Sequence, residues 1–221
     1  MKRRVLVSWS SGKDSAWALH ALRAEPHTEV VGLLTAFNAS GVSVHAVPRA
    51  LVEAQARASG LPLYAFDLPS PCPNDAYEAA FRAAIARVPG ITHVAFGDLF
   101  LEDIRAYRIR LLTGTGIEPL FPIWTTPRDT AALARRMTAG GLRATLVCVD
   151  TTQLDARYAG RSYDAALLAE LPPTVDACGE NGEFHTFCHD GPMYSHPIPV
   201  HATPGAAGGR FAYASVSAAE A

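Results

Sequence analysis

Several features that would place a protein in a membrane or on nucleic acid are missing from this sequence. No apolar run approaches the ~18 residues that a membrane-spanning helix needs, and no signal-peptide pattern opens the chain. The formal net charge is -2, and no basic run follows Lys2, Arg3 and Arg4, so a broad nucleic-acid-binding face is not indicated. We therefore expect a cytoplasmic protein with neither membrane nor nucleic acid as a partner.

Metal-binding motifs are missing as well. The sequence has four cysteines but no CxxC pair, and its eight histidines are scattered without the HExxH spacing of a zinc-binding helix. Buried free thiols are the expected state of the cysteines, which are Cys72, Cys148, Cys178 and Cys188. We expect no structural metal site.

What the chain does contain is a regular alternation of apolar runs and helix-period segments. Hydrophobic residues make up 49% of 221 residues, enough to bury a core. The alternation is typical of the α/β class, in which helices cover both faces of a parallel sheet. Strands are predicted at residues 4–9, 30–37, 61–68 and 91–97, and helices at 14–24, 48–59 and 101–112.

The pattern changes near residue 124, where Thr125, Thr126 and Pro127 interrupt it. Residues 1–124 are predicted to form the nucleotide-binding domain, and 125–221 a smaller α+β subdomain on the substrate side. Its predicted helices span 129–139 and 163–171, and its predicted strands 145–150, 198–202 and 210–216. In the first domain, Asp75 and Glu78 have the spacing of a capping box that opens one more helix.

The turn after the first strand has the composition of a phosphate-binding loop. A strand-to-helix turn presents unpaired N–H groups and the positive end of the helix dipole to an anion. The Walker A spacing is absent, since Val7 stands at its first glycine and Asp14 follows Lys13, and GxGxxG is absent too. A merely structural turn is the alternative. The predicted nucleotide-binding residues are Ser10, Ser11, Gly12, Lys13, Asp14 and Ser15, with Thr35 from the end of the second strand.

This hexapeptide resembles the PP-loop, S-G-G-x-D-S, of ATP pyrophosphatases with the HUP-type, Rossmann-like fold, and departs from it at Ser11, where Gly is usual. The resemblance implies that residues 10–15 hold the β and γ phosphates of ATP, which leave as pyrophosphate with the help of Mg²⁺. It also implies that the substrate attacks the α phosphate. Lys13 and Asp14 are accordingly predicted as catalytic residues.

Four further segments make the resemblance to a particular family more specific: residues 97–108, 116–124, 178–187 and 190–192. Together with the loop they are similar to the diphthine-ammonia ligase family over about residues 4 to 195. The similarity implies an ATP-dependent ligase that adenylates a carboxylate and amidates it with ammonia, with ATP and Mg²⁺ as cofactors. The acceptor is a small-molecule carboxylate or a modified, diphthine-like protein side chain, and the sequence leaves the choice open.

Carboxylates in these segments are the candidates for metal and substrate chemistry. Asp98 and Glu183 are predicted to be catalytic, and Asp14 and Asp98 to hold Mg²⁺. The predicted substrate-binding residues are His45, Glu102, Arg105, Glu180, Asn181 and His185. Glu183 would favour the protonated form of His185. A solvated helix face around Glu102, a plain surface turn around Asn181 and a satisfied loop histidine at His45 remain the alternatives.

Two other functions stay open at this point. A tRNA-modifying PP-loop enzyme would have a similar loop, but the catalytic cysteine pair and basic surface common in that class are not evident. A nucleotide-binding sensor or regulatory protein of the same fold would need fewer metal-binding acids. The sequence does not decide whether the chain forms a homo-oligomer.

Overall fold

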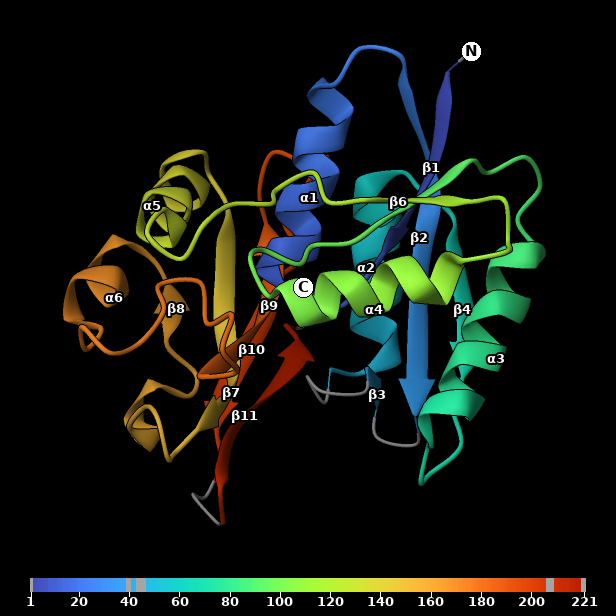
Figure 1. Ribbon diagram of the computed structural model, residues 1–221. Coiled ribbons are helices and arrows are strands. Elements are labelled where there is room, and N and C mark those ends of the chain that lie inside the picture. Colours follow the sequence, from blue (N-terminus) through green and yellow to red (C-terminus); the bar gives the residue numbers. More distant parts are fainter. Residues whose placement is uncertain (1, 39–40, 43–46, 206–208, 220–221) are drawn as a thin grey trace.

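The computed structural model describes residues 2–38, 41–42, 47–205 and 209–219, which form two sheets (Figure 1). Five parallel strands build the first sheet in the spatial order β4-β2-β1-β5-β6, and β3 (Gly41–Val42) adds a short antiparallel pairing to β2. This is a Rossmann-like arrangement and confirms the predicted fold class. The parallel strands are β1 (Arg3–Ser8), β2 (Thr28–Asn38), β4 (Leu63–Asp67), β5 (His93–Ala95) and β6 (Glu118–Leu120).

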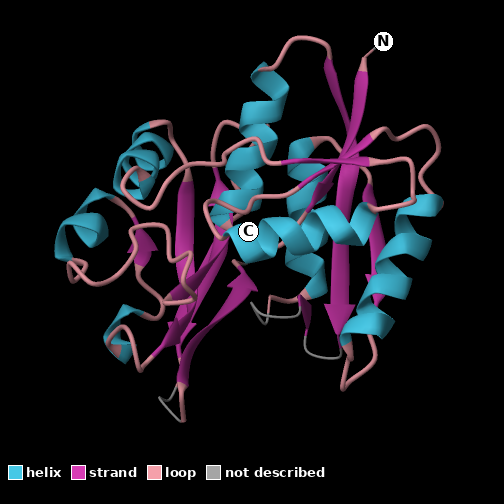
Figure 2. Ribbon diagram, in the orientation of Figure 1, coloured by secondary structure: helices cyan, strands magenta, loops and turns pink. Residues whose placement is uncertain are grey.

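Helices cover both faces of this sheet, because successive side chains of each strand point to opposite sides. In β1, Val5 and Val7 pack in one hydrophobic cluster with α1 (Lys13–Ala24) and α2 (Arg49–Ser59). Leu6 packs in another cluster with the other pair of helices. That second pair is α3 (Asn74–Ala86) and α4 (Glu102–Leu112), which lie side by side in Figure 2.

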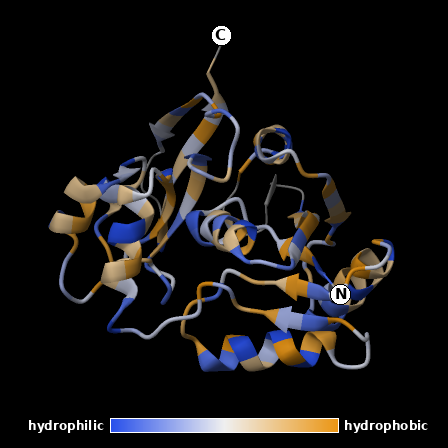
Figure 3. Ribbon diagram, turned by 90° about the horizontal axis from the view of Figure 1, so that it is seen from above, coloured by the Kyte–Doolittle hydropathy of each residue, from blue (hydrophilic) through white to orange (hydrophobic). Residues whose placement is uncertain are grey.

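The helix ends follow local chemistry in most places. Pro48 precedes α2, and Gly60 ends it in the left-handed conformation that glycine adopts without strain. The predicted capping box before α3 is wrong: the helix begins at Asn74, and the Asp75 carboxylate accepts only the N–H of Ala76. Figure 3 shows hydrophilic and hydrophobic segments alternating along the helices, as expected for helices with one buried face.

The second sheet is antiparallel and belongs to the C-terminal part of the chain. Its central strand β7 (Arg143–Asp150) pairs with β9 (Phe184–Asp190) on one side, and with β8 (Ser162–Tyr163) and β11 (Phe211–Ala218). β10 (Val200–Pro204) extends it through β11. Its helices are α5 (Thr130–Ala139) and α6 (Ala165–Glu170), with a short 3₁₀ helix at Ala156–Tyr158. The predicted division at residue 124 stays a prediction.

One hydrophobic cluster joins the two sheets, with α1 between them (Figure 1). Within it, the buried side chain of Gln55 on α2 makes three hydrogen bonds. Its amide nitrogen donates to the carbonyls of Ser11 and Cys188, and its oxygen accepts the indole N–H of Trp9. A single side chain therefore links the end of β1, the following loop and β9.

A search of the described residues for a long, apolar helix that would cross a bilayer finds none.

We expect Gln55→Leu to lower the free energy of unfolding by about 3 kcal/mol, because it leaves the buried Trp9 N–H without an acceptor and removes two further bonds. Chemical denaturation measures this. Arg57→Leu, on the exposed side of the same helix, serves as control and should change stability by less than about 0.5 kcal/mol. Equal effects of the two substitutions would contradict the role given to Gln55.

Candidate functional site

The loop between β1 and α1 is held in shape from several sides. Ser11 has a φ of 68°, a left-handed conformation that costs a non-glycine residue roughly 1–2 kcal/mol. Its carbonyl accepts the N–H of Cys188 at 2.9 Å and the amide of Gln55 at 3.0 Å. The Ser10 and Ser15 hydroxyls lie 3.2 Å apart. The loop thus keeps an unusual backbone conformation because β9 and α2 fix it.

A cavity of about 150 Å³ opens beside this loop. It lies where β1 and β5 end, which is the edge of a parallel sheet at which ligands collect. The structure brings together five of the residues predicted from the sequence: Ser10, Asp14, Ser15, Asp98 and Glu180. The other residues that line the cavity are Ser8, Phe96, Gly97 and Arg108.

Gly97 is needed for the close approach of β5 to α1. A Cβ atom at this position would lie 2.8 Å from the Ser15 nitrogen and 2.9 Å from the Asp14 carbonyl carbon. Any larger residue would push the two segments apart, so the width of the cavity depends on this glycine.

Two carboxylates line the cavity from different segments of the chain. Asp98 accepts a hydrogen bond from Arg108 Nε at 3.1 Å. Glu180 accepts the N–H of Leu99 at 2.7 Å. Burial raises the pKa of Glu180 to about 7; the Leu99 N–H and Lys13 oppose the rise, and the carboxylates of Asp14 and Asp98 add to it. At neutral pH both the protonated and the ionised form of this carboxyl group are therefore populated.

Lys13 lies away from the cavity and is only 2% exposed. Its ammonium donates to Asp14 at 2.8 Å and to the carbonyl of Cys178, and it lies over the rings of Tyr163 and Phe184 at 5.5 and 5.4 Å. Burial is the largest single influence and would lower the pKa of Lys13, but Asp14, Cys178 and Glu180 together outweigh it and the pKa is raised. The ammonium connects the phosphate-type loop to the second sheet's loop, a contact that the sequence analysis did not foresee.

The loop at 176–183 is closed by its own acidic side chains. Glu183, 2% exposed, accepts the N–H groups of Asp176 and Asn181 and the side-chain amide of Asn181. Asp176 accepts the N–H groups of Cys178 and Glu180. Glu183 thus shapes the loop that presents Glu180 to the cavity, and its predicted catalytic role stays a prediction.

Several other predicted residues lie outside the cavity lining. Thr35 donates its hydroxyl to the Trp9 carbonyl at 3.0 Å and so fixes the backbone before the loop. Glu102 is 75% exposed, and Arg105 stacks 4.7 Å from the Trp124 ring and 5.4 Å from the Phe121 ring.

The predictions for the two histidines, His185 and His45, have different outcomes. Burial, with Lys13 adding to it, lowers the pKa of His185 to about 4, so the expectation that Glu183 favours a protonated His185 is wrong. His45 lies outside the described residues.

Four lining residues were not among the predicted site residues, and Arg108 is the charged one of them. Burial would lower its pKa, but Asp98 and Tyr77 raise it, so the guanidinium remains charged. The sequence signal was a cationic pair three residues apart, Arg105 and Arg108, and only the packing of α4 shows which member faces the cavity.

The residues present fit a metal-bound phosphate group. Asp14 Oδ1 is buried without a hydrogen-bond partner among the described residues, and carboxylate oxygens are the ligands that Mg²⁺ prefers. In the first turn of α1, the Lys13 N–H donates to the Thr186 hydroxyl at 3.1 Å, and the next N–H groups, of Asp14 and Ser15, have no intrahelical acceptor. No cluster of three or more metal-binding side chains occurs in the described part of the chain, so phosphate or water oxygens would complete the coordination.

The fold defines the class first: a Rossmann-like α/β protein with an antiparallel C-terminal subdomain. Residues 2–117 match the diphthamide synthase N-terminal domain and residues 129–210 the diphthamide synthase C-terminal domain. The chain therefore belongs to the diphthamide synthase family. This is an ATP-dependent ligase family, so membership implies the use of ATP.

A curated relative from Danio rerio is described as diphthine--ammonia ligase. It is 28% identical over 225 residues, which cover 90% of this chain and 87% of the relative. The two matched family domains together include the loops at 10–15 and 176–183.

We expect Lys13→Met to lower the free energy of unfolding by about 3–5 kcal/mol, because it leaves the Asp14 carboxylate and the Cys178 carbonyl without their buried cation. The double variant Lys13→Met with Asp14→Asn should recover part of the loss, since it removes the unpaired charge. Thermal and chemical denaturation of both variants measure this. An unchanged stability with lost turnover would instead assign Lys13 to the leaving group.

The raised pKa of Glu180 predicts a pH dependence of stability. Because the folded state binds this proton more tightly than the unfolded state, its contribution is present below about pH 4.5 and is lost as the pH rises through about 7. Glu180→Gln keeps the acceptor for the Leu99 N–H and should flatten this decline. Denaturation curves between the two pH values measure the slope, and parallel slopes for wild type and variant would contradict the assignment.

Proposed function

We propose that the chain is an ATP-dependent adenylating ligase that amidates a substrate carboxylate with ammonia, in the manner of a diphthine-ammonia ligase. The observation that carries the proposal is the cavity at the β1 and β5 ends. It combines serine hydroxyls, the start of α1, three carboxylates and Arg108 in one place. Family membership and the Danio rerio relative support the same reaction type.

The chemistry follows from the weakness of a carboxylate as an electrophile. Its oxygen leaves poorly, and its charge repels a nucleophile. In the proposed reaction the carboxylate attacks the α phosphate of ATP and pyrophosphate leaves. Ammonia then forms the C–N bond, and AMP departs with the former carboxylate oxygen. The net change is carboxylate, ATP and ammonia to amide, AMP and pyrophosphate.

In this proposal the chain mainly binds and positions, as in phosphoryl transfer generally. Ser10, Ser15 and the first N–H groups of α1 hold the β and γ phosphates. Asp14 and Asp98 hold Mg²⁺, which supplies charge neutralisation at the phosphates. Arg108 holds Asp98 in place and adds positive charge at the cavity wall. Glu180 faces the acceptor side.

The acceptor is a diphthine-like protein side chain or a small carboxylate, and the reaction is proposed to take place in the cytoplasm. A purely nucleotide-sensing role is the less favoured reading of the site. The observation against it is that Asp14, Asp98 and Glu180 all line one small cavity beside the phosphate-type loop, because carboxylates beside phosphates suit Mg²⁺ and a sensor has less need of them.

The test is product analysis of the purified protein with ATP, Mg²⁺, ammonium and a panel of carboxylates. We expect AMP and pyrophosphate to form only with an accepted acid, and Asp98→Asn to lower turnover on the order of 100-fold with an unchanged fold. Asp103→Asn, the same change at an exposed position of α4 that does not line the cavity, serves as its control and should retain activity. ADP and phosphate as products, or equal turnover of wild type and Asp98→Asn, would contradict the proposal.

A further inference from the structure

A second pocket lies on the other side of the wall that bounds the phosphate-loop cavity. It has a volume of about 440 Å³ and is lined from three segments: the stretch after β5, the start of α5, and the stretch that runs from α6 into the loop at 176–183. Representative lining residues are Phe100, Ala131, Leu168, Val175, Asp176 and Asn181. We call it the 168–181 pocket.

Neighbouring residues of the same two segments line the two spaces. Gly97 and Asp98 line the cavity, and Phe100 lines the pocket. Likewise Glu180 lines the cavity and Asn181 the pocket. The Leu99 N–H to Glu180 hydrogen bond of 2.7 Å joins the two segments at this boundary. A molecule seated in the pocket would therefore have one end beside the cavity.

The pocket is also coupled to the loop that shapes the cavity. Asp176 lines the pocket, and its Oδ2 accepts the N–H of Glu180 at 3.0 Å. The buried ammonium of Lys13 holds the neighbouring Cys178 carbonyl. Since these bonds fix the loop from both sides, the pocket has a defined shape without a ligand.

The charge of the lining limits what it can bind. Most of it is aliphatic or proline, and among these described residues none is Lys, Arg or His. The only ionisable lining group is the Asp176 carboxylate. A ligand with a second negative charge in this pocket would lose hydration, meet no cation and lie near an anion.

We propose that the 168–181 pocket binds the body of the carboxylate acceptor, and that it selects monocarboxylates over dicarboxylates. This inference rests on the proposed function for the reaction itself, and it adds the place and the chemical class of the acceptor. The reacting carboxylate lies at the Phe100 and Asn181 end, next to the phosphate-loop cavity.

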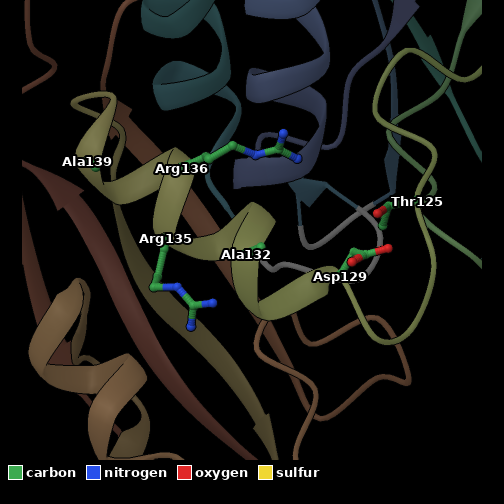
Figure 4. Close-up of a pocket in the computed structure, with 6 residues that line it drawn as sticks. All are labelled: Thr125, Asp129, Ala132, Arg135, Arg136 and Ala139. Carbon is green, nitrogen blue, oxygen red and sulfur yellow. The ribbon is translucent and has the colours of Figure 1, made fainter.

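Two neighbouring residues of α5 offer a matched pair of variants. Ala131 lines the 168–181 pocket, whereas Ala132 faces a different pocket with Thr125, Asp129, Arg135 and Arg136 (Figure 4). Ala131→Trp should fill the pocket, and Ala132→Trp should leave it open. Thr174→Trp, at an exposed lining position of the pocket, is a second filling variant in case Ala131→Trp fails to fold.

The test uses hexanoate and adipate, acids of equal chain length with one and two carboxylates, followed by amide chemical shifts of the whole chain. We expect saturable shifts around Ala131, Val175 and Ala177 with hexanoate at millimolar concentrations, and at least tenfold weaker binding of adipate. Ala131→Trp and Thr174→Trp should each abolish the hexanoate shifts, and Ala132→Trp should retain them.

Absence of saturable hexanoate binding, equal binding of adipate, shifts centred elsewhere, or equal loss in all three variants would overturn the inference. A different result would contradict the proposed function. Hexanoate bound at the pocket without AMP and pyrophosphate from any acid would contradict the ligase reaction and leave the pocket assignment intact. AMP formation with hexanoate bound elsewhere would contradict the pocket assignment and leave the ligase reaction intact.

Discussion

The arrangement of the site depends on one buried ammonium group. Lys13 begins α1, yet its charge is held by Asp14 beside it and by the carbonyl of Cys178, 165 positions further along the chain. A buried cation is tolerated only when it is paired and hydrogen-bonded. The ammonium therefore stabilises the contact between the loop at 176–183 and the loop at 10–15.

The remaining polar groups at this junction support the same contact. Gln55 holds the Ser11 carbonyl from α2, and Glu183 closes the loop that carries Glu180. These side chains lie behind the cavity and leave its surface to Ser10, Asp14, Asp98 and a few neighbours. Buried side chains thus hold the loops in place, and other polar groups line the cavity. This arrangement suits a reaction that relies on positioning and electrostatics.

Much of the first sheet could be predicted because its signals are local. An apolar run, a turn of Ser and Gly and a helix-period segment are enough to place residues 10–15 at a strand end. The direction of the Lys13 side chain could not be predicted, since it is set by a partner remote in sequence. The choice between Arg105 and Arg108 depended on the packing of α4. The capping box at Asp75 failed because Asp75 lies inside the first turn of the helix.

The most direct test of the central claim is a calorimetric titration with α,β-methylene-ATP and Mg²⁺, which measures nucleotide binding without any acceptor. The account predicts that the wild type binds the nucleotide and that Gly97→Ala, whose Cβ would lie 2.8 Å from the Ser15 nitrogen, binds at least tenfold more weakly. Absence of binding by the wild type, or equal affinities of the two proteins, would contradict a triphosphate site at the ends of β1 and β5.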